Sequence, residues 1–240
     1  MKVSFFVTCI ADNVLTNIGI KSIELLEELG CDVVFNPKQT CCGQPLANTG
    51  YHKKAKKSMR VLIDALLEDG CDYVVAPSGS CVLQVKEFPH FFRDEAGWAD
   101  KATVLVDKTF EITDFIVNVL KVTDVGASLT GRAAYHPSCH MSRLLGVKEP
   151  PILLLQHVSG LQLVPFKGQD KCCGFGGTFA VKMADLSGAM VTEKVQNIAA
   201  AGVDYVIGAD GACLMNIEGC IKREGYNIRV YHVVEVLMMR

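Results

Sequence analysis

Two Cys-Cys-Gly sequences are the feature of this chain that is best suited to chemistry. They occupy residues 41–43 and 172–174. Neighbouring cysteines rarely form a disulfide with each other, because the ring that such a bond closes is strained. Two thiols on one glycine turn are better suited to binding a metal, since glycine lets backbone N–H groups approach the sulfur atoms. The two turns therefore predict metal sites, and other residues must complete them.

The bulk composition is that of a globular protein without a surface for nucleic acid. Hydrophobic residues make up 50% of the 240 residues, and the formal net charge is −2 with no block of like charge. No apolar run reaches the roughly 18 residues that a membrane-spanning helix needs. The apolar start of the chain ends at Asp12 without a signal-peptide cleavage site. We expect a cytoplasmic protein that neither binds nucleic acid nor inserts directly into a membrane.

Eleven cysteines are many for a cytoplasmic chain, and they favour metal binding or redox chemistry over structural disulfides. Internal repetition separates eight of them from the rest. Segments 70–81 and 202–213 match at seven of twelve positions, counting one Val/Ile exchange, and the cysteines recur at offsets of 130, 131 and 132 residues. Such regular offsets indicate a duplicated unit. The two equivalent sets are Cys9, Cys41, Cys42 and Cys81, and Cys139, Cys172, Cys173 and Cys213.

Each repeat alternates the apolar pattern of strands with the amphipathic pattern of helices. The expected strands are residues 2–7, 32–35 and 73–76, then 133–135, 161–165 and 205–207. The expected helices are residues 15–29, 53–68 and 113–120, then 152–158, 179–200 and 230–237, with a joint at 122–130. This order predicts an α/β fold of two duplicated Rossmann-like parallel-sheet domains, residues 1–125 and 126–240, related by a pseudo-twofold.

In this fold the eight duplicated cysteines follow the carboxyl ends of strands, where open α/β sheets bind ligands. Thiolates gathered from three loops can hold zinc or an iron–sulfur cluster. Cys31, Cys71 and Cys220 have no counterpart in the other repeat. We expect these three to be small buried apolar residues.

The cysteine pattern resembles that of the cysteine-rich CCG-domain family, whose motif is a cysteine, a Cys-Cys-Gly turn and a Cys-x-x-Cys pair. The domain usually occurs twice, as in the B component of heterodisulfide reductase and the iron–sulfur subunits of glycolate oxidase and anaerobic glycerol-3-phosphate dehydrogenase. The resemblance covers the whole chain. The segments most similar to members that serve L-lactate utilisation are residues 6–9, 41–45, 78–81, 113–118, 172–179 and 181–184.

The resemblance implies an iron–sulfur electron-transfer component of a complex that oxidises L-lactate to pyruvate. The chain would relay electrons as a subunit of an L-lactate dehydrogenase complex, with no catalytic residue of its own. Its partners would be a ferredoxin-like iron–sulfur protein and a third protein. The implied cofactors are clusters of the [4Fe–4S] type, held by the two sets of four cysteines.

The chain departs from the family motif at the first cysteine of each Cys-x-x-Cys pair. Ser78 stands there in the first repeat and Asp210 in the second. The heterodisulfide reductase relatives use five cysteines for a noncubane [4Fe–4S] cluster, so the departure leaves the cluster type open. The alternatives are an ordinary four-thiolate cluster, a mixed site with an Asp210 oxygen, and zinc in one unit.

Other functions and other residues also stay open at this point. A disulfide reductase of the heterodisulfide reductase type, or a zinc-stabilised scaffold subunit, would use the same cysteines. His136 and His140 flank Cys139 and are candidates to donate to a cluster sulfur, tune its potential or relay a proton. Arg143 is either a surface residue or a group that stabilises thiolates or binds a carboxylate.

Overall fold

The computed structural model describes every residue from Met1 to Arg240. The chain divides into two compact units, unit 1 (Met1–Phe115) and unit 2 (Ile116–Arg240). Each unit contains one four-stranded parallel sheet, which confirms the duplicated α/β fold. The ends of the two domains expected at residues 125 and 126 stay a prediction. None of the helices combines the length and the apolarity that crossing a membrane requires.

The sheet of unit 1 has the strand order β2-β1-β3-β4. Its strands are β1 (Lys2–Phe5), β2 (Asp32–Val34), β3 (Tyr73–Ala76) and β4 (Thr109–Glu111). The apolar side chains of β3 are buried, since Val74, Val75 and Ala76 are at most 1% exposed. Burial of successive residues is typical of a parallel strand with helices on both faces of its sheet.

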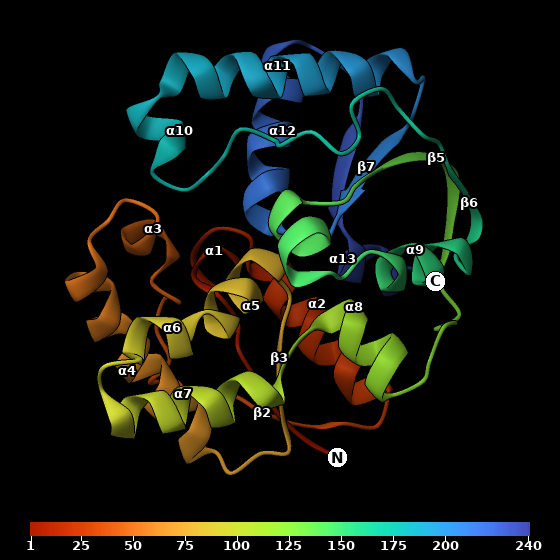
Figure 1. Ribbon diagram of the computed structural model, residues 1–240. Coiled ribbons are helices and arrows are strands. Elements are labelled where there is room, and N and C mark those ends of the chain that lie inside the picture. Colours follow the sequence, from red (N-terminus) through yellow and green to blue (C-terminus); the bar gives the residue numbers. More distant parts are fainter. The chain divides into compact units, whose positions relative to one another are not determined.

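The connections of unit 1 are helical. They are α1 (Cys9–Asn13), α2 (Thr16–Glu28), α3 (Gln44–Ala47), α4 (His52–Glu68), α5 (Gly79–Lys86), α6 (Phe88–Phe92), α7 (Ala96–Lys108) and α8 (Ile112–Asp114). Helices α4, α6 and α7 pack against one another and form one group, apart from α2 (Figure 1). Because crossovers between parallel strands are right-handed, α2 and α4 leave β1 and β2 toward opposite faces of the sheet.

Unit 2 repeats this arrangement, with the strand order β6-β5-β7-β8. Its strands are β5 (Ser128–His136), β6 (Ser159–Leu163), β7 (Tyr205–Gly208) and β8 (Arg229–His232). Its helices are α9 (Glu149–Gln156), α10 (Phe179–Lys182), α11 (Ala184–Ala200), α12 (Gly211–Arg223) and α13 (Val233–Leu237). Two π-helical segments complete the description, η1 (Phe115–Val119) and η2 (His140–Leu145). In Figure 1, α11 packs on α12, and α9 lies beside α13.

The core of unit 2 lies where β7, α11 and α12 meet. Val195, Val206 and Ile217 are fully buried there. Two of the predicted site residues, Cys173 and Cys213, belong to the same buried cluster. The candidate site of this unit is therefore built on the edge of its hydrophobic core.

Three parts of the predicted element pattern were wrong. Each sheet has a fourth strand, β4 or β8, which the sequence hides because these strands are short and carry polar residues such as Glu111 and Arg229. The helix expected over residues 179–200 is two helices, because Met183 leaves the helical conformation at φ −126° and ψ 52°. Strand β5 begins at Ser128, inside the segment expected to be a joint.

The strand order explains why the cysteine loops meet. In unit 1 the chain passes from β1 to β2 on one side and then to β3 on the other. The carboxyl ends of β1 and β3 therefore border the crevice in which open α/β sheets bind ligands. Cys9 follows β1, Cys41 follows β2 and Cys81 follows β3. The same order in unit 2 brings the equivalent residues to the same edge.

Each fourth strand ends on a buried residue that caps a short helix. Glu111 precedes α8, and its carboxylate accepts hydrogen bonds from the backbone N–H groups of Thr113 and Asp114. His232 precedes α13, and its Nδ1 accepts from the N–H of Val234. Both caps are at most 1% exposed. Burial raises the pKa of Glu111 to about 8, against the opposing effect of these hydrogen bonds.

Replacing Glu111 with Gln should change how stability depends on pH. The folded chain favours the neutral carboxyl, so its contribution is complete below the ordinary pKa of 4.5 and is lost as pH rises through about 8. The free energy of unfolding of the wild type, measured against Glu111→Gln, should fall across this window by about 5 kcal/mol at most, since each pKa unit corresponds to about 1.4 kcal/mol. Urea denaturation at several pH values measures this difference. A difference that does not vary with pH would contradict the prediction.

Candidate metal centre

Unit 1 brings its four predicted cysteines, Cys9, Cys41, Cys42 and Cys81, into one group, which we term the unit 1 site. Cys9 begins α1, Cys41 and Cys42 lie in the loop after β2, and Cys81 lies in the first turn of α5. Cys42 is buried and the other three are half-buried. Hydrogen bonds link Cys9 to Cys41, Cys41 to Cys42, and Cys42 to Cys81. The four sulfur atoms thus form a continuous chain of contacts.

Cys41 is the natural thiolate of the unit 1 site. Hydrogen bonds from Cys42 and Cys9, together with the N–H of Gly43, lower the pKa of Cys41 to about 3. The same bonds raise the pKa of Cys9 and of Cys42, and burial adds to this. One thiolate that accepts from two neighbouring thiols is a ready starting point for a metal, because the thiolate is the form that binds.

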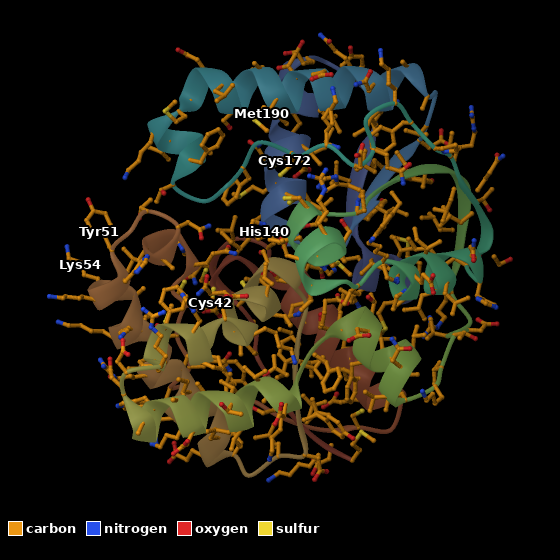
Figure 2. The ribbon with its side chains drawn as sticks, in the orientation of Figure 1. Cys42, Tyr51, Lys54, His140, Cys172 and Met190 are labelled. Carbon is orange, nitrogen blue, oxygen red and sulfur yellow. The ribbon has the colours of Figure 1, made fainter.

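Unit 2 repeats this group with Cys139, Cys172, Cys173 and Cys213, which we term the unit 2 site. The Sγ atoms of Cys139 and Cys172 lie 3.9 Å apart, and hydrogen bonds continue from Cys172 to Cys173 and on to Cys213. Cys172 is the thiolate here, since bonds from Cys139 and Cys173 lower its pKa, as does the N–H of Gly174 at 3.4 Å from its Sγ. Figure 2 shows Cys172 in the loop before α10, with Met190 of α11 beside it.

The glycine of each Cys-Cys-Gly turn is required by the backbone. Gly43 and Gly174 both have a backbone φ of 84°, a conformation that residues other than glycine rarely adopt. A Cβ on Gly174 would also lie 2.7 Å from the carbonyl oxygen of Ser187 in α11. The Ser187 hydroxyl donates a 2.8 Å hydrogen bond to the carbonyl of Gly174. Helix α11 therefore approaches the turn closely and fixes the position of the cysteine pair.

Backbone strain marks the same place in both units. Thr8 and Ser138 immediately precede the first cysteine of each site, and they have φ of 69° and 44°. Both are buried, at 3% and 1% exposure. Such a conformation costs on the order of 1–3 kcal/mol in a residue other than glycine, and it is found mainly where function demands it. In unit 2 the Ser138 hydroxyl also accepts a hydrogen bond from Cys213 Sγ at 3.8 Å.

Ser78 and Asp210, which replace a cysteine of the family motif, are helix N-caps. Ser78 caps α5, and its hydroxyl accepts from the N–H of Cys81 at 3.5 Å. Asp210 occupies the N-cap position of α12 in an extended conformation. Serine and aspartate are among the residues that N-cap positions favour most. Ser78 thus helps to position the helix that carries the last cysteine of its site, whereas Asp210 occupies the equivalent position without a side-chain capping hydrogen bond.

The two histidines beside Cys139 differ in their surroundings. His140 is half-buried, and its Nδ1 lies 3.7 Å from Cys139 Sγ. His136, at the end of β5, is 1% exposed. One ligand atom of His136 and the sulfur atoms of Cys173 and Cys213 lie within 4.8 Å of one another, and Asp210 does not belong to this group. Burial lowers the pKa of His136 to about 3, so the imidazole is neutral, the form that binds metals.

Each site opens on one side to a cavity, and the two cavities differ in charge. The unit 1 site borders a cavity of about 320 Å³ whose lining includes Cys9, Cys41, Asp12, Asn13 and Gln39. It carries an acidic residue and no basic one.

The cavity beside Cys172 measures about 280 Å³, and its lining includes Arg143, Lys171, Glu193 and Lys194. Lys171 forms an ion pair with Glu193, and Arg143 hydrogen bonds to the carbonyl of Asp170. Arg143, which lies in η2, is exposed and is held to the loop after β6 while it borders the site.

The sequence did not predict two further residues that border the sites, Gln39 and Lys194. Gln39 holds the loop after β2 to the end of β1, because its amide accepts from the N–H of Val7 and donates to the carbonyl of Phe5, both at 3.0 Å. No sequence signal identifies it. Lys194 is 2% exposed, and its Nζ donates to the carbonyls of Gly168 and Gln169. A lysine on the apolar face of a helix, between Val191 and Val195, is the signal that could have found it.

The three cysteines without counterparts lie apart from both sites. Cys31, Cys71 and Cys220 are 7%, 4% and 1% exposed, as predicted for small buried apolar residues. Burial is the main cause of the raised pKa values of Cys31 and Cys71. All 11 cysteines are free thiols, so the two sites are not closed by disulfides.

The donor set of each site fits a thiophilic metal or an iron–sulfur cluster. Four thiols from three loops, one of them already a thiolate, provide soft ligands of the kind that zinc and iron–sulfur clusters prefer. The buried His136 imidazole in unit 2 has no hydrogen-bond partner on either ring nitrogen. An unpartnered imidazole among sulfur atoms suits the position of a metal ligand. The role of the eight cysteines as ligands remains a proposal that these features support.

Comparisons with known proteins agree with this geometry. A family model described as "Cysteine-rich domain" (CCG) matches residues 3–86 and again residues 133–218. The chain is 56% identical to Lactate utilization protein A of Geobacillus thermodenitrificans and 54% identical to Lactate utilization protein A of Bacillus subtilis, in each case over 100% of both chains. Both matched segments contain one complete candidate site.

A solved structure supports the fold alone. A hypothetical protein from Helicobacter pylori superposes on this chain with a TM-score of 0.73 at 8% sequence identity. The match covers 99% of this chain and 48% of that one, so this chain spans about half the length of that structure.

Replacing Gly174 with Ala should disrupt the unit 2 site. The new Cβ would lie 2.7 Å from the carbonyl oxygen of Ser187, at a φ of 84°, so the Cys-Cys turn or α11 must move. We expect a loss of about 2–4 kcal/mol in the free energy of unfolding, from strain and overpacking together. Urea denaturation measures this loss.

Gly188→Ala is the matched control. Gly188 lies in α11 itself, and a Cβ there meets nothing within 4 Å. This change should be neutral or stabilising by up to about 1 kcal/mol, because alanine favours the helix. Equal losses in the two variants would show that the turn is not constrained as described.

Proposed function

This chain belongs to the family of proteins built from cysteine-rich CCG domains, and on that premise we propose that it transfers electrons through iron–sulfur groups at the unit 1 site and the unit 2 site. One observation carries the proposal. In each unit, four free thiols gather where three neighbouring parallel strands end. An iron–sulfur group bound there supplies one-electron redox chemistry.

The residues of each site have distinct tasks in such a protein. Cys41 and Cys172, as thiolates, would be the ligands most readily available to an iron ion, and their hydrogen-bonded neighbours would release protons on binding it. The N–H of Gly174 donates to Cys172 Sγ, and hydrogen bonds to ligand sulfurs tune the potential of a bound cluster. Buried Cys42, Cys173 and Cys213 place part of each group away from water.

The electrons transferred by this protein are proposed to come from L-lactate. Full-length relatives at 56% and 54% identity carry the name Lactate utilization protein A, which supports a role in a system of several proteins that uses lactate. Oxidation of lactate to pyruvate releases two electrons, and two one-electron groups in one chain suit the task of passing them on. We propose that the other subunits include a ferredoxin-like iron–sulfur protein, and that this chain works as a relay.

A disulfide reductase is the second candidate function, and the cavity of unit 1 favours it. This cavity of about 320 Å³ opens directly onto Cys9 and Cys41. It has room for a small substrate next to the sulfur atoms. Turnover of a disulfide by the isolated chain, without partner proteins, distinguishes this function from a relay.

The relay proposal predicts the metal content of cysteine variants. Purified without oxygen, the wild-type chain should contain iron and acid-labile sulfide and show an electron paramagnetic resonance (EPR) signal on reduction. Cys42→Ser and Cys172→Ser should each lose roughly half of the iron, since each removes one ligand from one unit. Cys71→Ser is the matched control, because Cys71 is buried outside both sites, and it should keep the full amount. Stoichiometric zinc without iron or a reducible signal would favour a scaffold and contradict the proposal.

The same variants test the role in lactate oxidation. In a host whose own copy of the gene is deleted and whose partner proteins are present, the wild type and Cys71→Ser should restore growth on L-lactate. Cys42→Ser and Cys172→Ser should not, because each interrupts the electron path. Normal growth with either site variant would contradict an obligatory relay through both units.

A further inference from the structure

His136 is the one buried histidine whose two ring nitrogens both lack a hydrogen-bond partner while it faces the cysteines of a candidate site. It ends β5, three residues before Cys139, and is 1% exposed. A neutral imidazole carries one donor and one acceptor nitrogen. Leaving an imidazole buried without hydrogen bonds costs about 1–3 kcal/mol. Such a cost indicates that His136 has a functional role at this position.

The surroundings of His136 provide a partner of a particular kind. One ligand atom of His136 lies within 4.8 Å of the sulfur atoms of both Cys173 and Cys213. Ligand atoms on one tetrahedral ion are roughly 3.5–4 Å apart, given metal–ligand bonds of about 2.0–2.3 Å. A movement of about 1 Å at most would thus let these three residues share an ion.

The equivalent position in unit 1 cannot bind a metal. Phe6 precedes Cys9 by three residues, as His136 precedes Cys139, and it is likewise 1% exposed. A second difference lies in the long helices. Ile63 of α4 corresponds to Lys194 of α11 at an offset of 131 residues, the same offset that relates Met59 to Met190. At the two positions where unit 2 has an imidazole and a buried ammonium group, unit 1 thus has two buried apolar residues.

We propose that His136 is a metal ligand of the unit 2 site, so that unit 2 binds its group through cysteine thiolates and one imidazole, whereas unit 1 uses thiolates alone. This inference rests on the proposed function for the identity of the group, and on the geometry of His136 for the ligand. A bound metal would give the acceptor nitrogen of the imidazole a partner, since no protein group provides one. The two sites thus share one backbone arrangement but differ in the side chains that donate to the metal.

The difference in ligands sets an order of reduction potentials. An imidazole is neutral where a thiolate is negative, and histidine in place of cysteine raises the potential of an iron–sulfur cluster. The charge of Lys194 acts in the same direction, since it stabilises the added electron. The unit 2 group is therefore the more readily reduced of the two. An electron that can reduce either group therefore reduces the unit 2 group preferentially.

Nitrogen coupling in pulsed EPR tests the ligand directly. The experiment uses the full chain, purified without oxygen, loaded with iron and sulfide, and reduced. The wild type should show the strong hyperfine coupling of a directly bound imidazole nitrogen, and ¹⁵N-labelled histidine should change it. His136→Phe copies the residue of unit 1 and should abolish the coupling. His140→Phe is the matched control, because His140 lies 3.7 Å from Cys139 Sγ and should leave the coupling unchanged.

His136→Cys provides a second readout. It keeps a ligand at this position but restores a negative charge, so the cluster should be retained and its reduction potential should become more negative. A histidine that only positioned Cys173 or Cys213 would show no direct nitrogen coupling. An EPR signal without nitrogen coupling, or with a coupling that survives His136→Phe, overturns the inference and leaves the electron-transfer function standing.

If the chain binds no iron, the proposed function fails while the ligand assignment is still tested. The same protein, labelled with ¹⁵N-histidine and loaded with ¹¹³Cd, should show a one-bond cadmium–nitrogen coupling at one of its six histidines. His136→Phe should remove this coupling and weaken cadmium binding by unit 2 at least about tenfold, the lower end of the loss seen for residues that merely support ligands. Absence of the coupling, or of bound cadmium, overturns the inference.

Discussion

Repulsion between neighbouring thiolates is the constraint on which the arrangement of both units depends. Four sulfur atoms at hydrogen-bonding distance cannot all be negative unless a cation lies among them. The protein alone settles on one thiolate, Cys41 or Cys172, with its neighbours held as thiols. The sheet topology, the strained residues Thr8 and Ser138, and the glycine turns keep the sulfur atoms together. A thiophilic metal or cluster would supply the positive charge that lets the remaining thiols ionise and bind beside the first thiolate.

Duplication preserved the scaffold of this arrangement and changed its surroundings. Strand order, the positive φ before the first cysteine, and the N-cap before the last one are the same in both units. His136 and Lys194 of unit 2 replace apolar residues of unit 1. Under the proposed electron-transfer function, two similar sites with different neighbouring charge would give their two bound groups different reduction potentials. Such a difference agrees with a protein that passes electrons in one direction.

The sequence predicted the elements that follow strong local signals. Apolar strands, amphipathic helices and recurring cysteine offsets led to the α/β fold, to the two groups of four cysteines and to the burial of Cys31, Cys71 and Cys220. The missing parts depend on contacts between distant residues. Strand β4 contains buried Glu111, whose charge hides the strand pattern. The buried position of Lys194 and the bridging of two loops by Gln39 follow from packing. A residue-by-residue comparison of the two repeats shows the change from Phe6 to His136, but only the structure places this imidazole among the sulfur atoms.

Anomalous diffraction from crystals of the chain grown without oxygen is the most direct test that each unit holds its own thiolate-bound iron group. We expect two separate iron peaks, one within bonding distance of Cys41 and Cys42, and one within bonding distance of Cys172 and Cys173. The second peak should also lie next to the imidazole of His136. Iron in neither unit, or a zinc peak in place of both, would contradict the account.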